Sequence, residues 1–243
     1  MMLSYVLILA AYLIGTFYLQ RLNRFGRKMR GYFASLLLYA AAFIIPAMLL
    51  PDSLLSALFF VLIVLATHAV YFIGQSDLIT ARPKGLAAFV CTHMLIAAAL
   101  LLAVYFFFTG NAAFADVTDA LLSLFGDNAD TYLYFVLSVL ICLAPSSEFV
   151  RVTMDHFCPN YASEGTSYDH GGLGSTIGMF ERVIIMITGF MGWYVAIAFV
   201  VTAKSLARFK QFEDPDFVER FIIGTFSSIL VPLVLLFIMT QIF

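Results

Sequence analysis

Residues 173–210 read LGSTIGMFERVIIMITGFMGWYVAIAFVVTAKSLARFK, a long and largely apolar run that can fold in two ways. As one helix it would be about 57 Å long at 1.5 Å per residue, well beyond the roughly 30 Å hydrocarbon core of a membrane. Gly189-Phe190-Met191-Gly192 offers a place to turn, and the Trp193-Tyr194 pair that follows favours a membrane–water interface. We therefore expect two membrane helices, at 173–189 and 191–210, joined by a tight outer turn.

The composition of the whole chain indicates that lipid is its main solvent. Hydrophobic residues make up 63% of the 243 residues, and charged residues only 12%. Soluble domains have about 45–50% apolar and about 25% charged residues, so a water-soluble core of this length could not hide so much apolar surface. We expect an all-α, polytopic membrane helix bundle in a single transmembrane domain, 1–243. Its eight membrane helices include six further apolar runs, at 3–19, 32–50, 54–73, 86–108, 131–147 and 217–241.

The distribution of charge favours eight helices over seven. Cytoplasmic loops of membrane proteins are rich in Lys and Arg. With eight helices and an N-terminus outside, all 13 Lys and Arg residues fall on one side, and the other side carries aspartates without any basic residue. We therefore expect both the N-terminus and the C-terminus outside the cell. A seven-helix arrangement would move four basic residues to the wrong side: Lys204, Arg208, Lys210 and Arg220.

Two segments carry a family resemblance. The weaker is 12–20, Tyr-Leu-Ile-Gly-Thr-Phe-Tyr-Leu-Gln, and the stronger is the C-terminal third. Together they resemble a bacterial membrane family catalogued as domain of unknown function 3307, whose members often have His and Asp where this chain has Tyr12 and Thr16. The resemblance implies a multi-pass protein of the bacterial inner membrane, and it implies no reaction. The segments of the C-terminal third are Gly172, Ile177-Gly178, Glu181-Arg182, the glycine turn, Ala203-Lys204-Ser205, Ala207-Arg208-Phe209 and Phe221-Ile222-Ile223-Gly224-Thr225.

Ionisable residues inside the predicted helices are the first candidates for function. Glu181 and Arg182 lie about two turns into the sixth predicted helix, where charged groups are costly and tend to be functional or paired. A structural interpretation pairs Glu181 with Lys204 or Arg208 of the next helix, while Arg182 extends to the lipid headgroups. A role in gating or binding is the alternative.

Two histidines lie in neighbouring predicted helices. His68 and His93 are both in the membrane interior, on helices that run antiparallel, so they could approach one another. Such a pair could carry protons or bind a metal. The alternative is two neutral imidazoles that are hydrogen-bonded to the backbone or to Thr67 and Thr92.

The longest predicted cytosolic loop also contains polar residues, although no standard zinc, phosphate-binding, dinucleotide-binding or nucleophile motif is present in the chain. Cysteine, histidine and aspartate can bind zinc together, but this spacing matches no zinc finger or ribbon. The sequence therefore assigns no metal and no cofactor, and a solvated loop is the alternative. The loop candidates are Asp155, His156, Cys158, Asp169 and His170.

A basic run follows the first predicted helix. Its charges alternate with Leu22, Phe25 and Met29, as in a helix on the surface of anionic lipid, and they also set the topology. The net charge of −2 argues against a nucleic-acid partner. The candidate lipid-headgroup residues are Arg21, Arg24, Arg27, Lys28 and Arg30.

Three functions remain open. The intramembrane charges and the short sixth helix favour a small transporter or permeation protein. The cytosolic loop suggests an intramembrane enzyme that acts on a lipid-linked substrate at the cytosolic face. The small residues Gly224 and Ser228 suggest close helix packing in a non-catalytic partner subunit or a homo-oligomer. Ahead of them, Asp214-Pro215-Asp216 predicts the start of the last helix.

Overall fold

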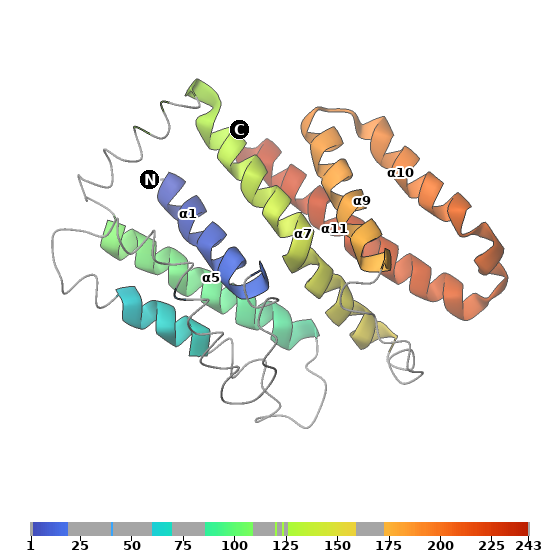
Figure 1. Cartoon of the computed structure of the whole chain (residues 1–243), viewed down its shortest axis with the longest axis horizontal. Helices are drawn as coiled ribbons and strands as arrows, with labels where there is room; N and C mark the ends of the chain where they lie inside the picture. Colours follow the sequence, from blue (N-terminus) through green and yellow to red (C-terminus); the bar gives the residue numbers. More distant parts are fainter. Residues whose placement is uncertain are drawn as a thin grey trace. The chain divides into compact units, whose positions relative to one another are not determined.

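In the computed structural model, almost all of the described residues are helical (Figure 1). No strand occurs among the described residues, which confirms the all-α prediction. The predicted helix at 32–50 lies outside them except for Ala40, as do the basic run at 21–30 and the loop residues Asp169 and His170. The described residues are 2–18, 40, 60–69, 86–108, 120, 123, 126–158 and 173–242.

The chain divides into two compact units, Met1–Leu137 and Ser138–Phe243, and each is described by itself. The boundary falls within α7 (Ala129–Phe157), so the first turns of this helix belong to the N-terminal unit and the rest to the C-terminal unit. The expectation of a single transmembrane domain stays a prediction.

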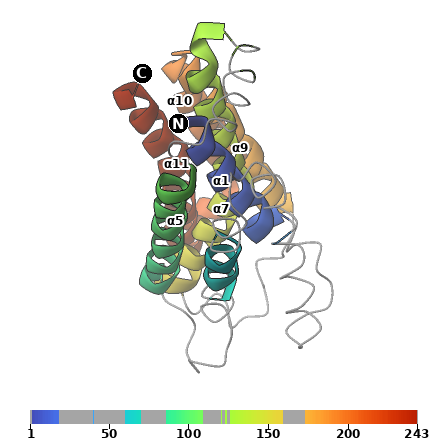
Figure 2. The ribbon, with the colours of Figure 1, turned by 90° about the vertical axis from the view of Figure 1, so that its left-hand side faces the viewer.

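The N-terminal unit is built from apolar helices. Helix α1 (Met2–Leu13) continues as a π-helix, η1 (Ile14–Tyr18), and α1 packs against α5 (Leu86–Phe108), as Figures 1 and 2 show. A shorter apolar helix spans Phe60–Ala69, and a 3-10 turn, η3 (Gly126–Asn128), precedes α7. These helices confirm the runs predicted at 3–19 and 86–108, and the shorter one lies inside the run at 54–73.

Among the residues described in the C-terminal unit, three further α-helices follow α7. Helix α9 (Leu173–Phe190) packs against both α10 (Tyr194–Ala207) and α11 (Pro215–Ile242). A 3-10 helix, η4 (Phe209–Glu213), leads into α11. As the sequence predicts, the carboxylate of Asp214 caps α11, because its Oδ1 accepts a hydrogen bond from the Asp216 N–H at 3.0 Å.

Two glycines of this unit allow a tight turn and a close approach of two helices. Gly192 has a φ of 76° and closes the turn between α9 and α10, where the Trp193 N–H donates to the Thr188 carbonyl at 2.7 Å. Such left-handed glycines commonly end helices, and the turn confirms the break predicted at 189–192. A Cβ on Gly189 would collide with the side chain of Leu236, so α9 and α11 approach closely at this point.

Among the described residues, three helices are long and apolar enough to cross a membrane. They are Leu86–Ala103 within α5, α7 and α11. The protein is therefore an α-helical membrane protein. The total of eight membrane helices and the sides of the termini stay predictions.

Helix α7 is longer than the sequence indicated. It was expected to end at 147, with Asp155 and His156 in the following loop, but it continues to Phe157, so both residues lie in its last turn. Arg151 explains the extension, because it forms ion pairs with Glu148 one turn before it and Asp155 one turn after it. Pairs at these spacings stabilise a helix that has left the apolar run.

Candidate functional site

An ion pair joins α9 to α10 inside the C-terminal unit. The Nζ atom of Lys204 lies 2.6 Å from Oε2 of Glu181, and the two side chains are 18% and 14% exposed. The pair predicted for Glu181 is therefore present, with Lys204 and not Arg208 as the partner. Each charge compensates the other in an environment where a lone charge would be expensive.

The next residue of α9, Arg182, carries a buried guanidinium. The residue is 3% exposed, and the donors of its side chain point to α7 and α11. Its Nε donates to the Cys142 carbonyl at 2.7 Å and its Nη1 to Ser228 Oγ at 2.9 Å. Its Nη2 donates to Ser147 Oγ at 2.5 Å and to the Leu143 carbonyl at 3.4 Å. The expectation that Arg182 extends to the headgroups is wrong, because acceptors inside the unit hold it.

The acceptors on α7 lie around a proline. Pro145 lacks an N–H group and weakens the helix at this point, which is tolerated in membranes where side chains satisfy the freed backbone groups. The Ser146 hydroxyl donates to the Cys142 carbonyl at 2.5 Å, and that of Ser147 donates to the Leu143 carbonyl at 2.8 Å. Arg182 thus binds two carbonyls that the serines also use. The sequence reading missed Cys142, Leu143 and Ser147, although a Pro-Ser-Ser segment in an apolar run was a usable signal.

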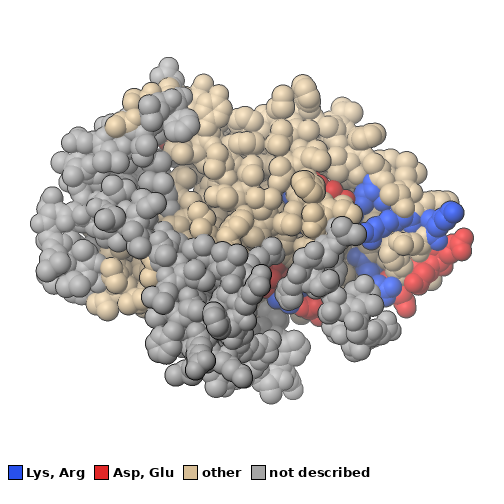
Figure 3. All heavy atoms as spheres, in the orientation of Figure 1, with Lys and Arg blue, Asp and Glu red and all other residues tan. Residues whose placement is uncertain are grey.

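Charged side chains gather at one end of the C-terminal unit (Figure 3). This end is made by the last turns of α7 and α10, by η4 and by the first turns of α11. Asp214, which precedes α11, and Asp216 in its first turn are exposed. Trp193 and Tyr194 lie at the opposite end of α9 and are 61% and 62% exposed. The unit therefore has a charged end and an uncharged, aromatic end, as expected for helices that meet water on one side and an interface on the other.

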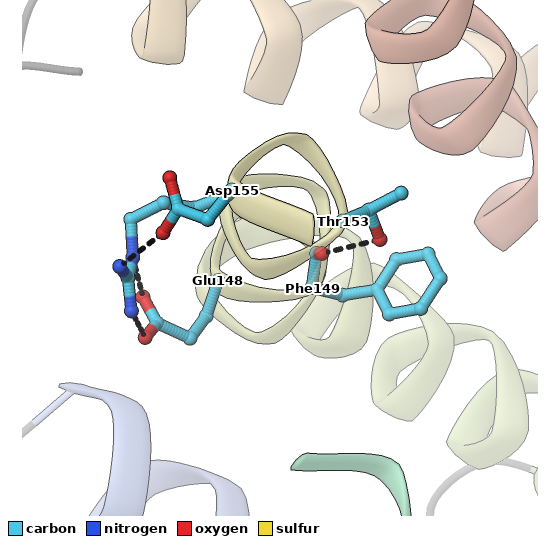
Figure 4. A network of polar contacts seen from close by, with 5 residues as sticks. Glu148, Phe149, Thr153 and Asp155 are labelled. Carbon is cyan, nitrogen blue, oxygen red and sulfur yellow. Dashed lines mark hydrogen bonds and ion pairs between the residues drawn. The ribbon is translucent and has the colours of Figure 1, made fainter. Parts of the chain in front are cut away.

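The charges of α7 form a network of their own. Figure 4 shows Glu148 and Asp155 on one side of the helix and Phe149 and Thr153 on another. Nη1 of Arg151 lies 3.0 Å from Asp155 Oδ2, and its Nε donates to Glu148 Oε2 at 3.2 Å. Asp155 is thus paired with Arg151 at the end of α7.

Cys158 follows directly after α7, and its N–H donates to the Met154 carbonyl at 2.8 Å. Burial raises the pKa of the Cys158 thiol, while the nearby charge of Arg220 lowers this pKa and that of Glu219 raises it. Within the described part of the chain, no group of three or more His, Cys, Asp and Glu side chains could hold a metal. The predicted loop cluster also requires Asp169 and His170, so it stays a prediction.

The two predicted membrane histidines lie in the N-terminal unit. His68 is fully buried in the helix Phe60–Ala69. His93 bonds through Nδ1 to the Phe89 carbonyl at 2.8 Å, which confirms the backbone-bonded alternative for this residue. Thr67 donates its hydroxyl to the Val64 carbonyl at 2.8 Å. The approach of His68 to His93 stays a prediction.

The fold and this site define an α-helical membrane protein with an ion pair and a buried arginine inside its C-terminal helices. Comparisons with known protein families, with characterised proteins and with solved structures found no match. The family resemblance in the C-terminal third therefore stays a prediction.

Proposed function

We propose that the protein is a small transporter or permeation protein of a bacterial inner membrane, with eight membrane helices and both termini outside. The ion pair between Glu181 and Lys204 carries this proposal. Ionised side chains in membrane helices are costly to keep and often mark the path of an ion or solute. With exposures of 14% and 18%, the two side chains are mostly buried, and neither is fully enclosed.

Helix α10 supports the presence of a moving part. None of its residues is buried, and it packs against α9, to which the Glu181–Lys204 pair also ties it. Transporters move one group of helices against another so that the site opens to each side in turn. A proton or ionic solute that competes for either member of the pair would change how α10 is held.

Arg182 supplies the fixed side of this arrangement. Its hydrogen bonds join α9 to α7 and α11, whereas the neighbouring Glu181 joins α9 to α10. Two successive residues of one helix therefore connect it to a closely bonded core and to an open outer helix. This division supports gating at α10 and not at α11.

The charged end of the C-terminal unit supports the proposed orientation, because basic residues gather on the cytoplasmic side of membrane proteins. We propose that the uncharged turn with Trp193 and Tyr194 faces outward and that the basic run at 21–30 binds anionic headgroups. Membership of the family catalogued as domain of unknown function 3307 is part of the same proposal.

The purified protein in liposomes tests the proposal. We would follow proton, potassium and chloride flux under an imposed potential, using dyes trapped inside. We expect flux of at least one of these ions above that of empty liposomes, and a loss of about tenfold or more in Glu181→Gln, because that change removes one charge of the pair. Glu213→Gln is the control, since Glu213 is exposed in η4. Flux equal to that of empty liposomes for all three ions would overturn the proposal.

A non-catalytic partner subunit is the second candidate. Close packing favours it: a Cβ on Gly224 would lie 3.4 Å from Met154 Sδ, and Ser228 is committed to Arg182. Absence of flux, together with a second membrane protein that copurifies at fixed stoichiometry, would favour this function over transport.

A further inference from the structure

The N-terminal unit contains polar side chains that the proposed function does not use. Tyr12 in α1 is 4% exposed and Thr16 in η1 is 2% exposed. Helix α1 packs against α5, and the ring of Phe17 in η1 lies 5.3 Å from that of His93 in α5. Neither Met2–Tyr18 nor Leu86–Phe108 contains a charged residue. Tyr12, Thr16 and His93 thus lie in helices that carry no charge.

Thr16 lies in the π-helix η1. Gly15, Thr16 and Phe17 are three successive buried residues there, as are Ala11, Tyr12 and Leu13 in α1. A π turn holds more residues per turn than an α turn, and such turns are frequent at functional sites.

The hydroxyl of Thr16 differs from those of other threonines in the molecule. Thr67 and Thr153 are both 5% exposed, and each donates its hydroxyl at 2.8 Å to a carbonyl in the preceding turn. Among the residues that the structure describes, Thr16 Oγ1 has no such partner, although it is fully enclosed. Buried hydroxyls are almost always hydrogen-bonded, so this oxygen indicates a partner beyond the described residues.

His93 presents a complementary atom. Because a carbonyl only accepts hydrogen bonds, the contact with Phe89 places the ring proton on Nδ1 and makes Nε2 an acceptor. The imidazole ring lies 5.3 Å from the ring of Phe17, the neighbour of Thr16, and 6.4 Å from that of Tyr12. The imidazole of His93 therefore lies beside the segment that carries the hydroxyls of Tyr12 and Thr16, among aromatic rings.

We infer that Tyr12, Thr16 and His93 form a binding site for an uncharged hydroxyl group, supplied by a buried water molecule or by a lipid-soluble phenol. A hydroxyl group can accept a hydrogen bond from the Thr16 hydroxyl and donate one at the same time. An ionised ligand does not fit, because these helices offer no opposite charge. The rings of Phe17, Phe89 and Tyr12 suit the flat face of a phenol.

Removal of one hydroxyl tests whether the site is occupied. Thr16→Val keeps the shape of the side chain and removes its hydrogen-bonding atom. If a bound hydroxyl group is the partner, the melting temperature of the full-length protein in detergent falls by about 2–4 °C. Thr16→Ser keeps the hydroxyl and should stay closer to the wild type. Thr67→Val is the matched control, because it removes a buried hydroxyl that already has a partner within its own helix.

Addition of p-cresol distinguishes the two sources. A saturable rise in the melting temperature of the wild type and of Thr67→Val, absent in Thr16→Val, supports a phenol. Destabilisation by Thr16→Val without any response to p-cresol supports a bound water molecule. The inference is overturned if Thr16→Val is at least as stable as the wild type and p-cresol again has no effect. That result would mean that the native hydroxyl is buried without a partner.

Discussion

Arg182 illustrates how a membrane helix can keep a guanidinium in its interior. Its planar group reaches two carbonyls and a serine of α7 and one serine of α11. Hydrogen bonds from a charged donor are roughly twice as strong as those between neutral groups. The residue thereby joins three helices at one point, and the fork of donors matters as much as the charge.

Arg182→Lys tests this role. Lysine keeps the charge but offers three donors on one nitrogen, so it cannot reach acceptors on both α7 and α11 in the same geometry. We expect the free energy of unfolding in mixed micelles to fall by about 2–4 kcal/mol, given about 1.5–3 kcal/mol for each hydrogen bond to a charged group. Arg208→Lys, a partly exposed position in the same unit, should change it by less than about 0.5 kcal/mol. Equal effects of the two changes would contradict the role given to Arg182.

The sequence predicted the pair of Glu181 and Lys204 but not the contacts of Arg182. Glu181 and Lys204 lie on consecutive predicted helices joined by a tight turn, so their pairing followed from spacing and charge. Cys142 and Ser228 lie 40 and 46 residues from Arg182 along the chain, and their contacts depend on which helices pack together. Apolar runs look alike, so hydropathy could not predict that α7, α9 and α11 meet at Arg182.

Among the elements, α7 and the α9–α10 turn differ in how far the sequence predicted them. The turn followed from Gly189 and Gly192, and the observed Gly192 conformation is one that glycine adopts without strain. The sequence predicted that α7 ends at residue 147, because the apolar run stops where Glu148 appears, but the helix continues to Phe157. Ion pairs along the helix stabilise its continuation beyond the apolar run, and in the sequence they are indicated only by the spacing of the charged residues.

Gly189→Ala probes the contact between α9 and α11. The new methyl would collide with Leu236, so we expect a loss of about 1–3 kcal/mol of stability, as for other overpacked sites. Adding Leu236→Ala should cost less in this background than in the wild type, because the two side chains compete for one space. Gly174→Ala is the control, since a Cβ there meets nothing within 4 Å. Strict additivity of the first two changes would show that the helices do not meet at Gly189.

At the scale of the whole molecule, composition was the most informative property. A chain with 63% hydrophobic residues must place most of its surface in lipid, and α5, α7 and α11 have the length and composition to do so. The proposed orientation in the membrane rests on the distribution of Lys and Arg along the whole chain. It is therefore tested on the full-length protein.

Cysteine labelling in intact cells tests the orientation. With Cys91→Ala and Cys142→Ala, Cys158 is the sole cysteine, and an impermeant maleimide should modify it only after the cells are permeabilised. Labelling is best done near a pH of about 8.5, because burial raises the pKa of this thiol. Asn128→Cys in the same background, at an exposed position of η3 on the predicted outer side, should react without permeabilisation. Rapid reaction of Cys158 from outside would reverse the proposed topology.

The bond between Glu181 and Lys204 also bears on biosynthesis. The translocon releases a segment into lipid according to its transfer free energy, and a charge at the centre of a helix raises this by about 2.5–3.5 kcal/mol. As each helix leaves the ribosome, α9 carries Glu181 and Arg182 without Lys204, and α10 then arrives with the lysine. Because the turn at Gly192 is short, α9 and α10 can pair first and then enter the membrane as one hairpin, with the ion pair between Glu181 and Lys204 already formed. Membrane insertion of α9 should therefore require that α10 has been synthesised.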